Sequence, residues 1–139
     1  MDRKQSGNFE EHPMTEKPDQ YVSCGSEART ISVKSIEGKA TYGGELRAKP
    51  LIMGEHMTFL DIQYTKGVGA PLHTHTHESL VYVVSGKIKT TIDDEDFILE
   101  PGDACLHPAG VPHTVEALED STMVEIKSPA PDIAKFFDW

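Results

Sequence analysis

Three histidines recur at every second residue between Gly67 and Gly86, at positions His73, His75 and His77. Successive side chains of an extended strand point to opposite faces, so residues two apart share a face. If this segment is extended, the three imidazoles therefore point the same way. Neutral imidazole is a common ligand of divalent transition metals, so the spacing indicates a metal site.

A further histidine, His113, follows the turn Pro108–Pro112, which reads Pro-Ala-Gly-Val-Pro. The prolines restrict the backbone, so this turn presents the next side chain in a set direction. Because forty residues separate His73 from His113, only a fold that pairs distant strands brings the two together. A jelly roll pairs its strands in this way.

The elements that must position these histidines have the pattern of β-strands. Polar and apolar residues alternate, or β-forming residues dominate, over Thr30–Ile36, Met57–Tyr64, Leu80–Val84 and Lys87–Ile92. Further short strands are expected over Phe97–Leu99, Ala104–His107, His113–Glu116 and Thr122–Ile126. Turn residues recur about every 8–12 residues, which is typical of an all-β sandwich or barrel.

The length of 139 residues suits one domain with a substantial core. Residues 1–27 are polar and charged, so we expect a flexible N-terminal arm, followed by a single β-barrel domain over residues 28–139. The tail is expected to form a short helical turn with Asp132 as its N-cap. Its aromatic side chains, Phe136, Phe137 and Trp139, would pack on the outside of the barrel or across a dimer.

The composition excludes several classes of partner. A net charge of -10 argues against nucleic acid, which requires a basic surface. There is no apolar run long enough for a membrane span and no secretory signal at the N-terminus, so we expect a cytoplasmic protein with free thiols. The run Leu80–Val84 is apolar on both faces and needs cover on both sides, which, with the aromatic tail, predicts a homodimer.

Two segments resemble the two motifs of the cupin superfamily, in particular small single-domain cupins of the type-2 conserved-barrel kind. The first motif is glycine, five residues, His-x-His, three or four residues, glutamate, six residues and glycine. The residues that match it are Gly67, His73, His75 and Gly86. The second motif is glycine, five residues, Pro-x-Gly, two residues, histidine, three residues and asparagine. The residues that match it are Gly102, Pro108, Gly110 and His113.

This resemblance implies a jelly-roll β-barrel, often dimeric, that holds one divalent transition metal ion, Fe, Mn, Ni or Zn. The residues in the ligand positions are His73, His75 and His113. The chain departs from the family pattern twice, with Ser79 in place of the glutamate and Ala117 in place of the asparagine. The alternatives for a fourth ligand are Glu78, His77 and water.

The resemblance also implies chemistry on a small-molecule substrate. Our first hypothesis is a metal-dependent enzyme acting on a small oxygenated metabolite, with isomerase or lyase chemistry beside a carbonyl, such as the tautomerisation of unsaturated uronates. The alternatives are a three-His non-haem iron dioxygenase and a non-catalytic module that binds a sugar or small acid. The candidate catalytic residues are Glu78, as an acid or base, and Tyr64, which is expected to line the pocket.

Overall fold

The structure is a computed structural model that describes residues 21–137. The strands are β1 (Ile31–Val33), β2 (Ser35–Ile36), β3 (Lys39–Ala40), β4 (Leu46–Met53), β5 (Thr58–Tyr64), β6 (Gly69–His73), β7 (Glu78–Ser85), β8 (Ile88–Ile92), β9 (Glu95–Leu99), β10 (Ala104–His107), β11 (His113–Ala117) and β12 (Ser121–Ser128). The helix α1 spans Ile133–Phe136. Most of the expected arm, residues 1–27, and Trp139 in the tail lie outside the described residues.

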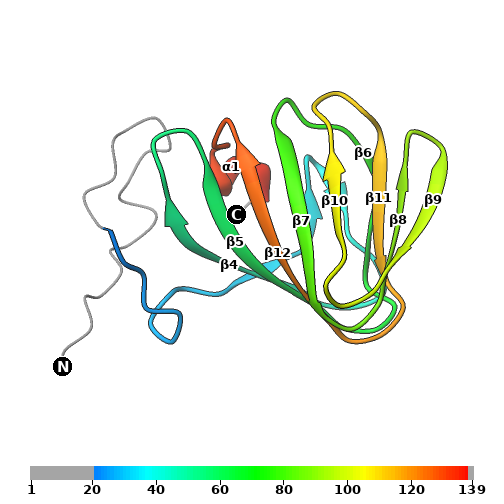
Figure 1. Ribbon diagram of the computed structural model, residues 1–139, viewed down its shortest axis with the longest axis horizontal. Coiled ribbons are helices and arrows are strands. Elements are labelled where there is room, and N and C mark those ends of the chain that lie inside the picture. The colour runs from blue at the N-terminus through cyan, green and yellow to red at the C-terminus, as the bar shows by residue number, and fades with distance from the viewer. Residues whose placement is uncertain (1–20, 138–139) are drawn as a thin grey trace.

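Two antiparallel sheets build the barrel (Figure 1). The larger has the strand order β1-β4-β5-β12-β7-β10, and the smaller has the order β6-β11-β8-β9. Strands far apart in sequence are neighbours, since β7 lies between β12 and β10 while β11 lies between β6 and β8. This arrangement confirms the predicted all-β jelly roll. The pairing of β11 with β6 brings the two predicted halves of the histidine cluster together.

Alternation along the strands decides which side chains fill the core. In β5 and β7 every second residue is buried, as expected of strands with one face inward. The buried apolar side chains of the two sheets form one cluster. Its members include Leu46, Leu60, Ile62, Val81 and Met123 from the larger sheet and Ala70, Ile88, Leu99 and Val115 from the smaller.

The sequence patterns did not predict β4 and β6, and each of these strands contains a proline. Proline has no N–H to donate to a ladder, so it is confined to edges and irregular positions. Pro71 lies in β6, an edge strand of the smaller sheet. Pro50 lies where β4 has passed the end of β1 and where its register with β5 shifts. Pro71 thus lies on an edge strand and Pro50 at an irregularity of the ladder, the two kinds of position where a strand tolerates proline.

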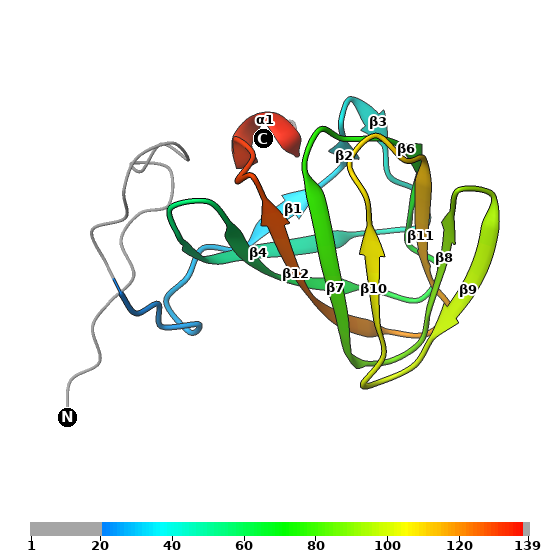
Figure 2. The same ribbon diagram turned by 45° about the horizontal axis from the view of Figure 1, so that its top comes forward.

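The C-terminal tail forms the predicted helical turn. The Asp132 side chain caps α1 by accepting a hydrogen bond from the backbone N–H of Lys135 at 3.3 Å. Phe136 and Phe137, however, are buried in the core cluster and do not pack on the outside of the barrel. The backbone N–H of Glu37, beside β2, donates to the carbonyl of Phe136 at 3.0 Å, so the tail folds over one end of the barrel (Figure 2).

The described part of the expected arm, residues 21–27, contacts the barrel. The Cys24 side chain is buried, and Lys49 of β4 donates to the carbonyl of Gly25 at 3.0 Å. A thiol packs as a small apolar group. The polar composition of the surrounding segment gave no indication that this side chain is buried. As expected, no disulfide forms among the described residues. Within residues 21–137, no helix is long and apolar enough to cross a membrane.

The outer face of β7 carries the apolar residues that were expected to need cover. Leu80, Tyr82 and Val84 are 52%, 49% and 50% exposed, because they alternate with the inward-facing Val81 and Val83. Leu106 of β10 is paired with Leu80 and is also exposed. The larger sheet therefore presents an apolar outer patch, and the predicted homodimer stays a prediction.

Candidate metal centre

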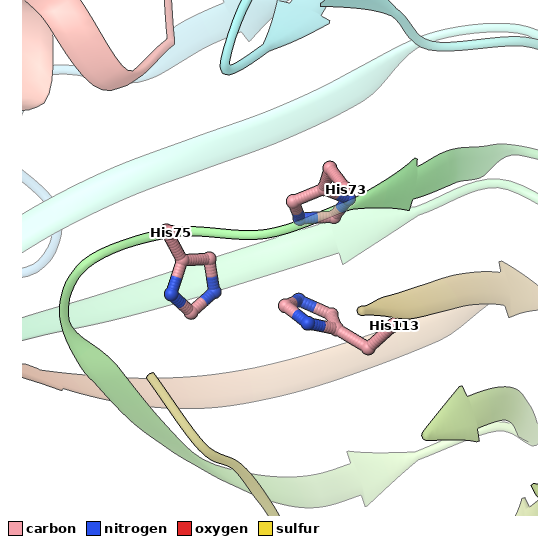
Figure 3. A group of neighbouring side chains, drawn as sticks. All are labelled: His73, His75 and His113. Atoms are coloured by element: carbon pink, nitrogen blue, oxygen red, sulfur yellow. The ribbon is translucent and has the colours of Figure 1, made fainter. Parts of the chain in front are cut away.

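Three histidines converge inside the barrel, as Figure 3 shows. His73 ends β6 and His113 begins β11, and the two residues are direct partners in the antiparallel ladder. His75 lies in the connection between β6 and β7. One ring nitrogen from each histidine lies within 4.8 Å of the other two, and all three side chains are buried.

The turn before His113 reaches across to His75. Gly110 has a φ of 75°, in the left-handed region that glycine adopts without strain. Its backbone N–H donates to the carbonyl of His75 at 2.9 Å. This hydrogen bond ties the rigid Pro108–Pro112 turn to the loop that carries His75, so the two sequence motifs are joined at the site.

Backbone carbonyls hold the three rings in a defined orientation. The Nδ1 atoms of His73, His75 and His113 lie 2.7, 2.6 and 3.2 Å from the carbonyl oxygens of Pro71, His77 and Val111, respectively. A carbonyl only accepts, so each Nδ1 carries the proton and each Nε2 keeps its lone pair. Three oriented Nε2 lone pairs match the donor set of a divalent transition ion.

Burial keeps these imidazoles neutral. It lowers the pKa of His73, and it lowers the pKa of His75 and His113 to about 4. The positive charge of Lys127 lowers the pKa of all three rings further. Metal binding requires the neutral form, so the rings are ready to bind at neutral pH without first losing a proton.

A small cavity lies against the three histidines. It encloses about 20 Å³, enough for roughly one water molecule. Its other lining residues include Tyr64, His107, Glu125, Lys127 and the two phenylalanines of the tail. Burial and the charge of Glu125 raise the pKa of Tyr64 well above 10, so its phenol stays protonated.

Two further histidines stack on the cluster without joining the ligand group. The ring of His77 lies parallel to that of His75, with centroids 3.9 Å apart and planes 3° apart. Its Nε2 makes no hydrogen bond within the described part of the chain. His107 is buried, and its Nε2 lies 2.9 Å from the Thr90 hydroxyl.

The two predicted catalytic residues lie in different environments. Tyr64 lines the cavity beside the histidines. Glu78 is exposed at the start of β7, on the face opposite the buried Ser79, and is not among the described residues that line the cavity. The alternation of β7 therefore separates the Glu78 carboxylate from the three imidazoles. Its acid or base role stays a prediction that this geometry does not support.

Sequence reasoning missed two charged residues of the site. Glu125 and Lys127 lie on the inner face of β12, beside the core residue Met123. Alternation along the strand places Met123, Glu125 and Lys127 on one face, and this pattern could have indicated that both charged residues face inward. The predicted strand, however, ended at Ile126, before Lys127. Lys127 donates to the Ser79 hydroxyl at 3.0 Å, so the position where the family motif has a glutamate accepts a hydrogen bond from a cation.

Comparison with known proteins agrees with the fold and identifies the family. The family described as "Cupin domain" matches residues 61–126. The "Polyketide synthase CurC" of Streptomyces cyaneus is 30% identical over 108 residues, which cover 73% of this chain and 70% of that protein. The "Pectin degradation protein KdgF" of Dickeya dadantii is 27% identical over 89 residues, covering 63% and 81%.

"Oxalate decarboxylase OxdC" of Bacillus subtilis is 30% identical over 87 residues, covering 59% of this chain but 23% of that protein, so the chain matches less than a quarter of this relative. Among solved structures, KdgF from a Halomonas species has a TM-score of 0.61 at 28% identity, covering 63% of this chain and 82% of that one. An RmlC-like cupin from Shewanella frigidimarina has a TM-score of 0.71 at 23% identity, covering 83% and 96%. With its two motifs, its jelly roll and its buried histidines, the chain belongs to the cupin family.

Proposed function

We propose that this chain is a metal-dependent cupin enzyme that acts on a small oxygenated metabolite, by isomerase or lyase chemistry beside a carbonyl. The metal ligands are His73, His75 and His113. The observation that carries the proposal is that one ring nitrogen from each of the three histidines lies within 4.8 Å of the others, while backbone carbonyls hold the three Nδ1 atoms. A divalent cation bound there supplies Lewis-acid polarisation of a substrate oxygen.

The residues around the histidines perform the remaining tasks. Phe136 packs edge-on against His75, with centroids 5.9 Å apart, and provides an apolar wall of the cavity. Tyr64 holds its proton and presents a neutral phenol, which donates a hydrogen bond to an oxygen of the substrate. The buried neutral histidines keep the ligand set intact at neutral pH.

The relatives support a uronate as the substrate class. One curated relative is named a pectin degradation protein, and the chain covers 81% of its length. Pectin is a polymer of a sugar acid, so its breakdown releases small molecules that carry carbonyl and carboxylate groups together. Such a molecule offers the oxygen donors that a cation held by three imidazoles still needs.

Metal analysis and a substrate assay test this function. Protein purified without added metal, and then reconstituted with Fe, Mn, Ni or Zn, is expected to hold about one ion per chain. The loaded protein is expected to convert unsaturated galacturonate, which NMR spectroscopy follows directly. Absence of bound metal after reconstitution would refute the proposal. Stoichiometric iron together with oxygen uptake would replace the isomerase by the dioxygenase alternative.

A further inference from the structure

A buried lysine, Lys127, lies beside the candidate metal centre, where burial lowers the pKa of its amine and the charge of Glu125 raises it. Lys127 is 2% exposed, and its ammonium group donates to the Ser79 hydroxyl at 3.0 Å. Glu125 Oε1 lies 3.6 Å from the ammonium nitrogen, and the Phe136 ring centroid lies 4.6 Å from it. The register of the larger sheet places Lys127, Ser79 and His107 side by side on three neighbouring strands. Lys127 is the cross-strand partner of Ser79, and Ser79 is the partner of His107.

Lys127 and Glu125 are the only charged side chains among the described residues that line the cavity. Burying a lysine is costly unless its charge is compensated. An ammonium group has three donors, of which the Ser79 hydroxyl accepts one, while the Glu125 carboxylate lies at ion-pair distance. The third direction meets the face of an aromatic ring, which is a weaker partner than an anion.

The ligand group adds no negative charge of its own. Among residues 21–137 it consists of three neutral imidazoles, and neither Glu125 nor any other carboxylate belongs to it. The charge of Glu125 is already matched by Lys127. A divalent ion held by the three histidines would thus leave the cavity with two uncompensated positive charges, in surroundings of low polarity where such charges interact strongly.

We infer that Lys127 recognises a carboxylate group of the molecule that binds at the three-His centre. The ligand class is then a small carboxylic acid with a second oxygen donor, such as a uronate or a hydroxy acid. This inference rests on the proposed function, because it names the substrate class of the same site. Ser79 and Glu125 are positioning residues that hold the ammonium group toward the cavity.

The size of the cavity limits what can bind beside Lys127 in this structure. Its volume of about 20 Å³ leaves no room for a sugar acid while Phe136 lies over Lys127. Phe136 is the last residue of the four-residue helix α1, which is held by the Asp132 cap, by a hydrogen bond from Glu37 and by burial of Phe136 itself in the core cluster. A ligand of this size would have to displace the ring, and its carboxylate would then replace the aromatic face beside the ammonium group.

Calorimetric titration with matched pairs of ligands tests the inference. The pairs are D-galacturonate with D-galactose, and lactate with propane-1,2-diol, so that each acid is compared with a neutral counterpart. Both the zinc-loaded and the metal-free full chain are titrated. The wild-type chain is expected to bind at least one acid more tightly than its counterpart in both forms. No preference for the acid in either pair would overturn the inference.

The decisive variant is Lys127→Met combined with Glu125→Gln, which leaves no unpaired charge buried. It is expected to lose the preference for the acid by about 10- to 100-fold, the range of one charge-assisted hydrogen bond, while it retains its zinc. Lys89→Met, on the exposed surface of the smaller sheet, is the matched control and should bind as the wild type does. An unchanged preference in a folded, zinc-bound double variant would make the pair purely structural and overturn the inference.

A second variant keeps the test decisive if the double variant does not fold. Ser79→Asp retains Lys127 but supplies it with a permanent carboxylate partner, so the same loss of preference is expected. Retention of the preference in this variant would count against Lys127. The proposed function fails separately, through absence of bound metal in the wild-type chain, and the titration of the metal-free form does not depend on that result.

Discussion

His107 stacks face to face on His113, with ring centroids 4.0 Å apart and planes 10° apart. The Nδ1 atom of the His113 ring also contacts the Val111 carbonyl, which restricts the orientation of the ring. Thr90 holds His107 in turn and also donates to the carbonyl of Thr114 at 2.7 Å. The ring of one proposed ligand is therefore oriented by packing on His107 of β10 and by a backbone carbonyl of the turn that precedes β11.

Replacement of His107 by alanine is expected to weaken metal binding without abolishing it. The His113 ring would lose its stacking partner but keep the carbonyl that fixes its tautomer, so the metal affinity should fall by about 10- to 100-fold. Competition with a chromogenic chelator measures this affinity. His56→Ala, an exposed substitution, is the control. An unchanged affinity would show that the stack contributes packing only.

Removal of a proposed ligand should have a larger effect. His113→Ala is expected to abolish stoichiometric metal binding, because two imidazoles remain, whereas His77→Ala should retain most of it. Elemental analysis after reconstitution and gel filtration measures both variants. Thermal unfolding of the metal-free proteins checks that each variant is folded. Equal losses in the two variants would mean that the ligand set has been chosen wrongly.

The metal-free protein is expected to lose stability as the pH falls from about 6.5 to about 4. The ordinary imidazole pKa is 6.5, and burial lowers it to about 4 in His75 and His113 and to about 2 in His77 and His107. As the pH falls from 6.5 toward the lowered pKa of each imidazole, the unfolded chain takes up protons that the folded chain does not. The free energy of unfolding therefore decreases with falling pH. The contribution of these imidazoles is fully present above pH 6.5.

Urea unfolding at a series of pH values measures this dependence. His77→Phe keeps a ring against His75 but cannot be protonated, so its stability should vary less steeply with pH than that of the wild type. His56→Ala should follow the wild-type profile. A wild-type stability that stays constant across this window would contradict the assignment of buried neutral rings.

The outer patch formed by Leu80, Tyr82, Val84 and Leu106 is expected to mediate a homodimer. These side chains lie about half exposed on neighbouring strands, where a second copy would remove apolar surface from water. Light scattering should report a dimer for the wild type and a monomer for Tyr82→Asp. Ile98→Asp, an equally exposed position on the smaller sheet, should leave the dimer intact. A monomeric wild type would refute this prediction.

Local patterns predicted much of the fold correctly. Alternation predicted β1 and β8, because a strand with one buried face must repeat with a period of two, and runs of β-forming or apolar residues predicted β5 and β7. These patterns missed β4 and β6, which contain Pro50 and Pro71. Whether a proline is acceptable depends on which strand, if any, lies beside it, and that neighbour belongs to the tertiary structure.

The sequence by itself determined which side chains could form the site: the spaced histidines, the rigid turn before His113, and the serine in place of the motif glutamate. Only the tertiary structure decided that His77 stacks behind His75, that Glu78 faces outward, and that Lys127 reaches Ser79. The physical reason is cross-strand register. Lys127 and Ser79 are 48 residues apart and become neighbours only when β12 pairs with β7, a contact that no local pattern encodes.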